Sequence, residues 1–205
     1  VLVNNAGAVF RHRTETRDGV ESTLAVNYLA AFQLTLRLLE RLEASAPSRV
    51  VIVSSDSHRV EKLDLDDLEL RKGYGTMKAY GRSKLALVYF TCELARRLRG
   101  TGVTVNAVDP GPVQSDIGQN NPGLAADLLK KVVMKHFFKP ADEACETAVF
   151  LATSPEMEGV TGGYYRFMDR RRPALDRHDP EGVARKLWNL SAQMTGADMP
   201  GPLSR

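Results

Sequence analysis

The chain has 205 residues, of which 43% are hydrophobic and 26% are charged, and its formal net charge is +3. This composition is ordinary for one globular domain with a core of its own. It excludes a membrane-spanning segment, because no apolar run reaches the thickness of a bilayer. The four histidines are isolated and the two cysteines are far apart, so no structural metal site is expected. Reduced cysteines favour a cytoplasmic location, with an N-terminal membrane anchor left open.

Continuous apolar runs alternate with helical patterns along the chain. The patterns predict strands at residues 1–3, 49–55, 103–109 and 163–168, and helices at residues 15–43, 78–99, 142–153 and 181–194. A polar insertion lies at 56–77 and a long excursion at 112–140. Strands that are apolar throughout and are separated by helices are typical of a parallel sheet. The sequence therefore predicts an α/β fold with a single domain over residues 1–205.

Two runs of arginine stand out from the mixed charge of the chain. Arg96 and Arg97 follow Glu93 on a predicted helix, and we interpret them as a solvated face. The run at 170–172 follows a strand and precedes a proline, which indicates a loop. This second run gives weak support to contact with phosphate or with a membrane surface, and no nucleic-acid partner is predicted from it.

The segment AYGRSKLAL at 79–87 carries a candidate catalytic pair. Tyr80 and Lys84 are four residues apart on a predicted helix, so they share one face. A tyrosine alone is a poor base near neutral pH, because its reference pKa is about 10. A nearby ammonium group favours the phenolate, so the pair suits general acid–base chemistry on an alcohol or a carbonyl. An aromatic ring packed on a lysine stem is the alternative interpretation of this spacing.

Other polar and turn residues fall at strand ends or on a facing helix. Ser55 ends the apolar strand VVIVSS, and Pro110 and Gly111 end the next strand. Open parallel sheets place their sites at the carboxyl ends of strands, which favours one shared site for these residues. Asn27 lies in an apolar stretch of a helix, and a buried amide needs a partner. It either caps a local irregularity of the backbone or serves a site.

Five short motifs stand in register along the chain: NNAG at 4–7, VN at 26–27, VSS at 53–55, YGRSK at 80–84 and DPGPVQS at 109–115. With these motifs the chain resembles the short-chain dehydrogenase/reductase family. The insertion before Tyr80, and the ending GGYYRF followed by ARKLWNLSAQMTG, are similar to the retinol dehydrogenase-like branch. The resemblance covers nearly the whole chain. It implies a Rossmann-like, doubly wound parallel sheet and an NAD(P)-dependent oxidoreductase.

The resemblance assigns roles to the residues that match these motifs. Tyr80 would be the catalytic acid/base, and Lys84 would lower its pKa and hold the nicotinamide ribose. Ser55 would polarise the substrate oxygen, and Asn27 would support a water relay from Lys84 to solvent. The implied cofactor is NADP or NAD, with NADP preferred.

The implied cofactor would also contact two loops. The loop along its adenosine side consists of Asn4, Asn5, Ala6 and Gly7. The absence of a side chain at Gly7 permits a close approach of the backbone. The loop beside the nicotinamide and the pyrophosphate supplies Pro110, Gly111, Val113 and Ser115.

The chain departs from the family pattern in three places. Asp109 stands where this branch usually has an uncharged residue or His. Tyr74 is a second tyrosine in the insertion, but it and Lys78 lie in a predicted loop, so we prefer Tyr80 as the acid/base. Neither the Gly-rich turn GxxxGxG nor the residue that would choose between NAD and NADP occurs in the chain. In the family's strand order, 3-2-1-4-5-6-7, VLVNNAG would be the fourth strand. The first three strands would then be absent, and we expect the natural gene product to be longer.

Substrate choice is expected in residues 56–78 and in a substrate loop, or lid, over residues 112–140. The apolar residues of the lid fit a lipophilic substrate such as a retinoid, a steroid or an aliphatic aldehyde, or else they form an ordinary amphipathic helix. They are Leu124, Leu128, Leu129, Val132, Val133, Phe137 and Phe138. The run LLKKVVMKHFF within the lid also gives a weak indication of membrane-surface contact.

Other functions and assemblies remain open at this point. The resemblance implies a homodimer through helices 20–43 and 79–99. The first alternative to an enzyme is a non-catalytic binding or scaffold protein of the same fold, or a fragment that is inactive because the Gly-rich turn is missing. The second is an epimerase or dehydratase of the extended branch of the family, against which the NNAG motif argues.

Overall fold

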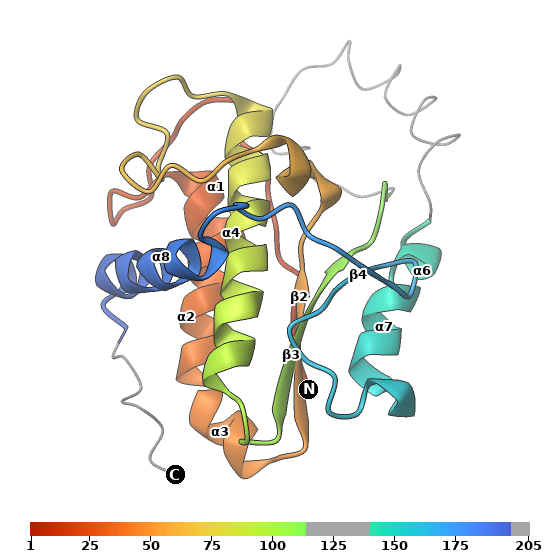
Figure 1. Ribbon diagram of the computed structural model, residues 1–205. Helices are drawn as coiled ribbons and strands as arrows, with labels where there is room; N and C mark the ends of the chain where they lie inside the picture. The colour runs from red at the N-terminus through yellow and green to blue at the C-terminus, as the bar shows by residue number, and fades with distance from the viewer. Residues whose placement is uncertain (114–139, 198–205) are drawn as a thin grey trace.

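The computed structural model describes residues 1–113 and 140–197, and these contain one five-stranded sheet (Figure 1). Its strands are β1 (Leu2–Asn4), β2 (Ser48–Val53), β3 (Val103–Asp109), β4 (Tyr164–Arg166) and β5 (Asp169–Arg171). They are adjacent in sequence order, with β1 to β4 parallel and β5 antiparallel to β4. The order of the four parallel strands confirms the predicted parallel α/β architecture.

Helices cover both faces of this sheet, as a doubly wound fold requires. They are α1 (Ser22–Leu24), α2 (Ala30–Arg37), α3 (Leu39–Ala44), α4 (Thr76–Arg97), α6 (Ala141–Ala144), α7 (Glu146–Thr153) and α8 (Pro180–Thr195). Figure 1 shows α2, α4 and α8 on one side of the sheet and α6 and α7 on the other. The described residues thus confirm a Rossmann-like arrangement with α4 at its centre.

The core follows from the alternation of side chains along the buried strands. In β2, Val50 and Ile52 face the side of α4, whereas Val51 faces the side of α7. A cluster of four aromatic rings, Tyr28, Phe32, Phe90 and Trp188, fills the space between α2, α4 and α8. Offset and edge-on ring contacts of this kind stabilise a core beyond the area that they bury.

The prediction of a helix over residues 15–43 is wrong for the first turns. Residues 15–21 form a loop closed by a bridge between Glu15 and Glu21, and α1 begins only at Ser22. The Glu21 carboxylate accepts hydrogen bonds from the next two free N–H groups of the helix, which fixes this start. A π-helical turn (Ala25–Leu29) follows and interrupts the regular helix. Only Val20 of this loop fits the apolar spacing, so the pattern did not support a helix over residues 15–21.

The loop predicted around the arginines at 170–172 is also wrong in part. Arg170 and Arg171 lie in β5, which pairs with β4 in a tight hairpin. The hairpin turns through Phe167 and Met168, whose φ angles are +52° and +62°. Such turns usually carry Asn or Gly, and neither is present here. The hairpin could therefore not be predicted from the sequence.

Arg96 and Arg97 do not form a simple solvated face. Both guanidinium groups bind the buried Glu93 carboxylate, at 2.8 Å each. The Arg97 guanidinium also lies over the Trp188 ring, 4.1 Å from its centroid. Arg97 therefore joins α4 to α8, and this contact depends on the packing of the two helices, which the sequence does not show.

The predicted lid falls almost wholly outside the described residues. Only 112, 113 and 140 of the range 112–140 belong to the part of the chain that the structure describes. The seven apolar residues of the lid, the run LLKKVVMKHFF and Ser115 all lie outside it.

Truncation of one ring of the aromatic cluster should destabilise the fold strongly. Phe32 is fully buried between α4 and α8. We expect Phe32→Ala to lower the free energy of unfolding by about 3–5 kcal/mol, because it removes buried apolar surface and leaves a cavity. Denaturant unfolding followed by circular dichroism measures the change. The control is Met77→Ala on the exposed start of α4, with an expected change of about 0.5 kcal/mol or less. Equal losses in the two variants would contradict this account of the core.

Candidate active site

The candidate catalytic residues meet at the carboxyl ends of the central strands. Ser55 lies just after β2 and caps a 3-10 helix (Asp56–Val60) by accepting a hydrogen bond from the Ser57 N–H. Tyr80 lies in the second turn of α4, and its side chain lies beside Ser55. The structure thus brings together two residues that are 25 positions apart in sequence, at the sheet edge where ligands bind in open α/β folds.

Lys84 is buried one helical turn beyond Tyr80. Its side-chain amine donates a hydrogen bond of 2.9 Å to the carbonyl oxygen of Val53, at the end of β2. The same nitrogen lies over the Tyr80 ring, 5.6 Å from its centroid. Burial lowers the pKa of Lys84 to about 8, and the nearby Asp109 carboxylate opposes this shift. The amine can therefore exchange a proton within about one pH unit of neutrality.

Burial raises the pKa of the Tyr80 hydroxyl above its ordinary value of 10.0. The Ser55 side chain opposes this shift, and the Asp109 charge adds to it. The sequence predicted that Lys84 lowers this pKa, and that lowering is not found. The Lys84 ammonium lies over the ring, and the desolvation of the phenol dominates. The hydroxyl is thus held protonated, as a general acid requires.

Asn27 lies in the π-helical turn and joins two elements of the site. Its side-chain oxygen accepts a hydrogen bond of 2.7 Å from the Ala8 N–H, and its Nδ2 donates to the Ala8 carbonyl at 3.0 Å. The Nδ2 also donates to the Ser83 hydroxyl at 3.0 Å, and that hydroxyl donates to the Tyr80 carbonyl at 2.7 Å. Asn27 therefore lies in an irregular stretch of backbone, and its role in a site stays a prediction. Its part in a water relay stays a prediction.

The loop after β1 opens toward the same sheet edge. Asn5, Ala6 and Gly7 are exposed, so their backbone groups are accessible to a ligand. Asn4 is buried, and its Nδ2 donates a hydrogen bond of 2.9 Å to Thr35 of α2. The side chain of Asn4 therefore anchors the loop to the helix layer.

The turn after β3 forms the other side of the site. Gly111 has a φ of +77°, and its N–H donates to the Asp109 carboxylate at 3.0 Å. A Cβ at this position would lie 3.4 Å from the Phe167 ring of the β4–β5 hairpin. Pro110 and Val113 are partly buried beside it. A glycine is needed at 111 because side chains rarely adopt this backbone conformation.

Two residues of the site were missed by the sequence analysis. The Ser54 hydroxyl donates to the Lys84 carbonyl at 2.9 Å and so fixes α4 against β2. His58 is fully buried, and its Nδ1 donates to the Ser55 carbonyl at 2.7 Å while its Nε2 accepts from the Ala174 N–H at 3.1 Å. Burial lowers the pKa of His58, so the neutral ring holds the Ser55 loop. Ser54 was adjacent to a named motif, whereas His58 gave no signal because its partner is 116 residues away.

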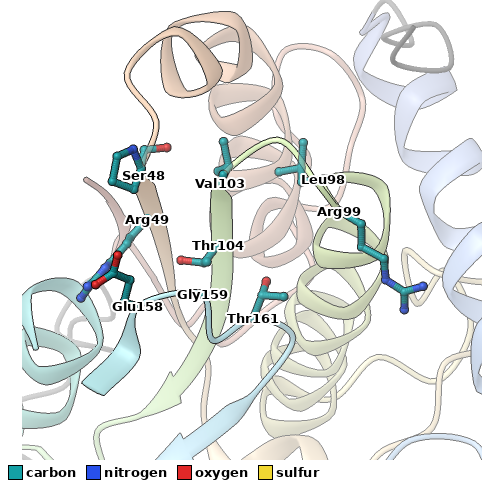
Figure 2. A pocket seen from close by; sticks show the side chains of 12 residues that line it. Ser48, Arg49, Leu98, Arg99, Val103, Thr104, Glu158, Gly159 and Thr161 are labelled. Atoms are coloured by element: carbon teal, nitrogen blue, oxygen red, sulfur yellow. The ribbon is translucent and has the colours of Figure 1, made fainter. Parts of the chain in front are cut away.

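A hollow of about 560 Å³ lies at the opposite end of the sheet (Figure 2). It is lined by the amino ends of β2 and β3, with Ser48, Arg49 and Thr104 among its residues. None of the candidate catalytic residues borders it, so it is separate from the site described above.

Two kinds of structural feature are absent from residues 1–113 and 140–197. No helix there is long and apolar enough to cross a membrane, and no cluster of three metal-ligating side chains occurs.

Comparison with known proteins agrees with this geometry. The model of the short chain dehydrogenase family matches residues 1–123, more than half of the chain. The chain therefore belongs to the short-chain dehydrogenase family.

Its relatives lie in the retinol dehydrogenase-like branch. Retinol dehydrogenase 14 of Mus musculus is 43% identical over 197 residues, which cover 96% of this chain and 59% of the relative. Polyprenol dehydrogenase of Homo sapiens is 41% identical over 202 residues, which cover 96% of this chain and 61% of the relative. The chain thus spans about three-fifths of the length of these proteins.

Solved structures share the fold. A protein from Mycobacterium Paratuberculosis is 31% identical with a TM-score of 0.71, over 97% of this chain and 68% of its own. The landomycin C-6 ketoreductase LanV, solved with bound NADP and rabelomycin, is 25% identical with a TM-score of 0.56. That match covers 80% of this chain and 58% of LanV.

The titration of Lys84 should be visible in the stability of the protein. A lysine whose pKa is lowered on folding binds fewer protons when folded, so the free energy of unfolding rises with pH between about 8 and the unfolded value of 10.5. Buried tyrosines lower the free energy of unfolding as the pH rises through about 10, because their pKa is raised on folding. The effect of Lys84 is therefore measured between about pH 7.5 and 9.5. We expect Lys84→Met to remove this rise. Denaturant unfolding at a series of pH values measures the slope, with Lys78→Met on the exposed start of α4 as the control. Equal slopes in wild type and Lys84→Met would contradict the lowered pKa.

Proposed function

We propose that the protein is an NAD(P)-dependent oxidoreductase. It would transfer a hydride between a nicotinamide cofactor and the alcohol or carbonyl group of a lipophilic substrate, with Tyr80 as the acid/base. The observation that carries this proposal is the convergence of three groups at one sheet edge. The Ser55 and Tyr80 side chains lie next to each other, and the Lys84 amine lies over the Tyr80 ring.

The residues present suit the nicotinamide and ribose portion of such a cofactor. The Lys84 ammonium has three N–H donors, and among the described contacts one of them is used, by the Val53 carbonyl. The others suit ribose hydroxyl groups. The open loop at 5–7 and the turn at Gly111 would lie against the rest of the cofactor. When bound, the cofactor would supply or accept the hydride. NADP is preferred over NAD because the similar LanV structure contains it.

The chain's own groups account for the movement of the proton. In the direction of carbonyl reduction, the Ser55 hydroxyl would donate a hydrogen bond to the substrate oxygen, and the Tyr80 hydroxyl would give its proton to that oxygen. The Lys84 amine, with its pKa of about 8, would stabilise the resulting phenolate and return a proton to it. Oxidation of an alcohol would use the same groups in reverse.

Two observations support a lipophilic substrate. The relatives are named retinol and polyprenol dehydrogenases, whose substrates are long apolar alcohols. The Phe167 and Met168 side chains are also exposed at the hairpin beside Gly111. The alternative is a non-catalytic protein of the same fold.

A pair of tyrosine variants tests the proposed acid/base directly. We expect Tyr80→Phe, made in the protein expressed from its complete gene, to lower kcat for NADPH-dependent reduction of retinal by about 10²–10⁴-fold, because the acidic proton is lost. Tyr74→Phe is the matched control, since its hydroxyl donates to the Phe10 carbonyl away from Ser55. We expect this second variant to retain activity.

The binding of NADPH and NADH to the same proteins separates chemistry from cofactor affinity. Fluorescence titration should give similar dissociation constants for wild type and Tyr80→Phe. A loss of turnover in Tyr74→Phe with full activity in Tyr80→Phe would refute the assignment. Tight NADPH binding without turnover of any alcohol or carbonyl would favour the non-catalytic alternative.

The predicted homodimer through helices 20–43 and 79–99 remains part of the proposal. Leu34 and Leu38 are exposed one turn apart on α2, which supports an apolar contact there. The residues of α4 from 81 to 91 are buried within the chain, so α2 would supply most of the contact.

A charge on α2 should therefore disrupt the dimer. We expect Leu34→Glu to shift the protein to monomers in sedimentation velocity, because a carboxylate would be desolvated at the interface. Val149→Glu is the control, since Val149 is equally exposed on α7 at the other face of the sheet. A monomeric wild type, or dimers in both variants, would argue against this interface.

A further inference from the structure

Three charged side chains, each buried or partly buried, contact one another in series next to the candidate active site. The series runs from Asp109, at the end of β3, through Arg166 of β4 to Asp56, the residue after Ser55. None of these three groups has a part in the proposed proton transfer. Asp109 is also the carboxylate that departs from the family pattern, so its position calls for a physical account.

The Asp109 carboxylate contacts both loops that border the site. Its Oδ1 accepts a hydrogen bond of 3.0 Å from the Gly111 N–H, in the turn after β3. The Asp56 N–H, in the loop after β2, also lies near this carboxylate. The Asp109 side chain is 3% exposed, so it is shielded from water between the two loops. One carboxylate thus links the Ser55 loop to the Pro110–Gly111 turn.

Arg166 supplies the compensating charge and extends the link to β4. Its Nε lies 3.2 Å from Asp109 Oδ2, which is the distance of an ion pair, although the two atoms are not aligned for a hydrogen bond. Its Nη1 donates to Asp56 Oδ2, and the two atoms are 2.6 Å apart. Asp56 Oδ1 accepts further hydrogen bonds from the Tyr164 hydroxyl at 2.9 Å and from Arg59 Nε at 2.8 Å.

The hydrogen bond between Arg166 and Asp56 restrains the position of the Ser55 loop, because planar guanidinium and carboxylate groups bond only in defined directions. Removing one partner of a buried ion pair leaves the other charge without compensation, and the surrounding loops must then rearrange. The loops concerned carry Ser55 and Gly111. A shift of about 1 Å in a group that positions a substrate lowers the rate of reaction by about 10²-fold.

We propose that Asp109 and Arg166 are positioning residues, which hold the Ser55 loop and the Pro110–Gly111 turn at a fixed separation so that the Ser55 hydroxyl faces Tyr80. This inference rests on the proposed oxidoreductase function for its effect on turnover. Its structural content, the coupling of the two loops through one ion pair, can be measured without turnover.

Steady-state kinetics of charge variants form the first part of the test. We expect Asp109→Asn and Arg166→Gln each to lower kcat by about tenfold or more, with KM for retinal changed by less than about threefold. The double variant Asp109→Asn/Arg166→Gln should lose no more than either single variant, because the two residues act as one unit. Arg166→Lys keeps the charge and should recover part of the activity lost in Arg166→Gln. Asp169→Asn, which removes an exposed acid paired with Arg171, is the matched control and should behave as wild type.

Hydrogen–deuterium exchange on the same proteins forms the second part. We expect faster exchange in Asp109→Asn for peptides that cover residues 55–61 and 109–113, and unchanged exchange in α8. If the double variant regains wild-type kcat, the pair only balances charge, and the positioning role is refuted. Faster exchange throughout the chain, α8 included, would likewise overturn it, because Asp109 would then act through overall stability.

The two parts separate this inference from the proposed function. If wild type shows no turnover but exchange rises only in the two named segments, the coupling of the loops is supported and the proposed function fails. If wild type turns over retinal and Asp109→Asn matches it in kcat and in exchange, the proposed function stands and the positioning role is refuted.

Discussion

The ammonium group of Lys84 is buried at the carboxyl edge of a parallel sheet, and the groups around it offset the free-energy cost of removing it from water. A charged amine removed from water needs hydrogen-bond acceptors and a compensating charge. The Val53 carbonyl at the end of β2 supplies an acceptor, and Asp109 at the end of β3 supplies negative charge nearby. Both come from strand ends that the parallel sheet brings side by side. The same constraint places Tyr80, one turn earlier on α4, next to Ser55.

The rest of the fold keeps α4 in place over that edge. Near its start, the Ser83 hydroxyl of the helix accepts a hydrogen bond from Asn27, which also donates to the Ala8 carbonyl in the loop after β1. At its end, Arg97 stacks on Trp188 of α8. The aromatic cluster fills the space between these two fixed points, so that α4 is packed along most of its length. A rigid helix of this kind can present two side chains to a ligand with little freedom to move.

The charged groups on the two sides of the site differ in how they are compensated. On the side of α4, burial moves the pKa of Lys84 toward neutrality, which suits the exchange of a proton. On the side of β4, the guanidinium of Arg166 forms ion pairs with Asp56 and Asp109. Proton transfer and positioning are thus assigned to separate groups, which are coupled through the Ser55 loop and through the Asp109 charge near Lys84.

The sequence by itself predicted the parallel α/β architecture from apolar runs and helical periodicity. The strand order and the set Asn27, Ser55, Tyr80 and Lys84 as candidates came from the resemblance of five short motifs to the family. Only the tertiary structure decided how the charges are paired. The bonds of Asp56 and Asp109 to Arg166 join residues from different strands, and a contact across 110 positions leaves no periodic trace in the sequence. The direction of the Tyr80 pKa shift was likewise decided by burial, which depends on every element packed around the phenol.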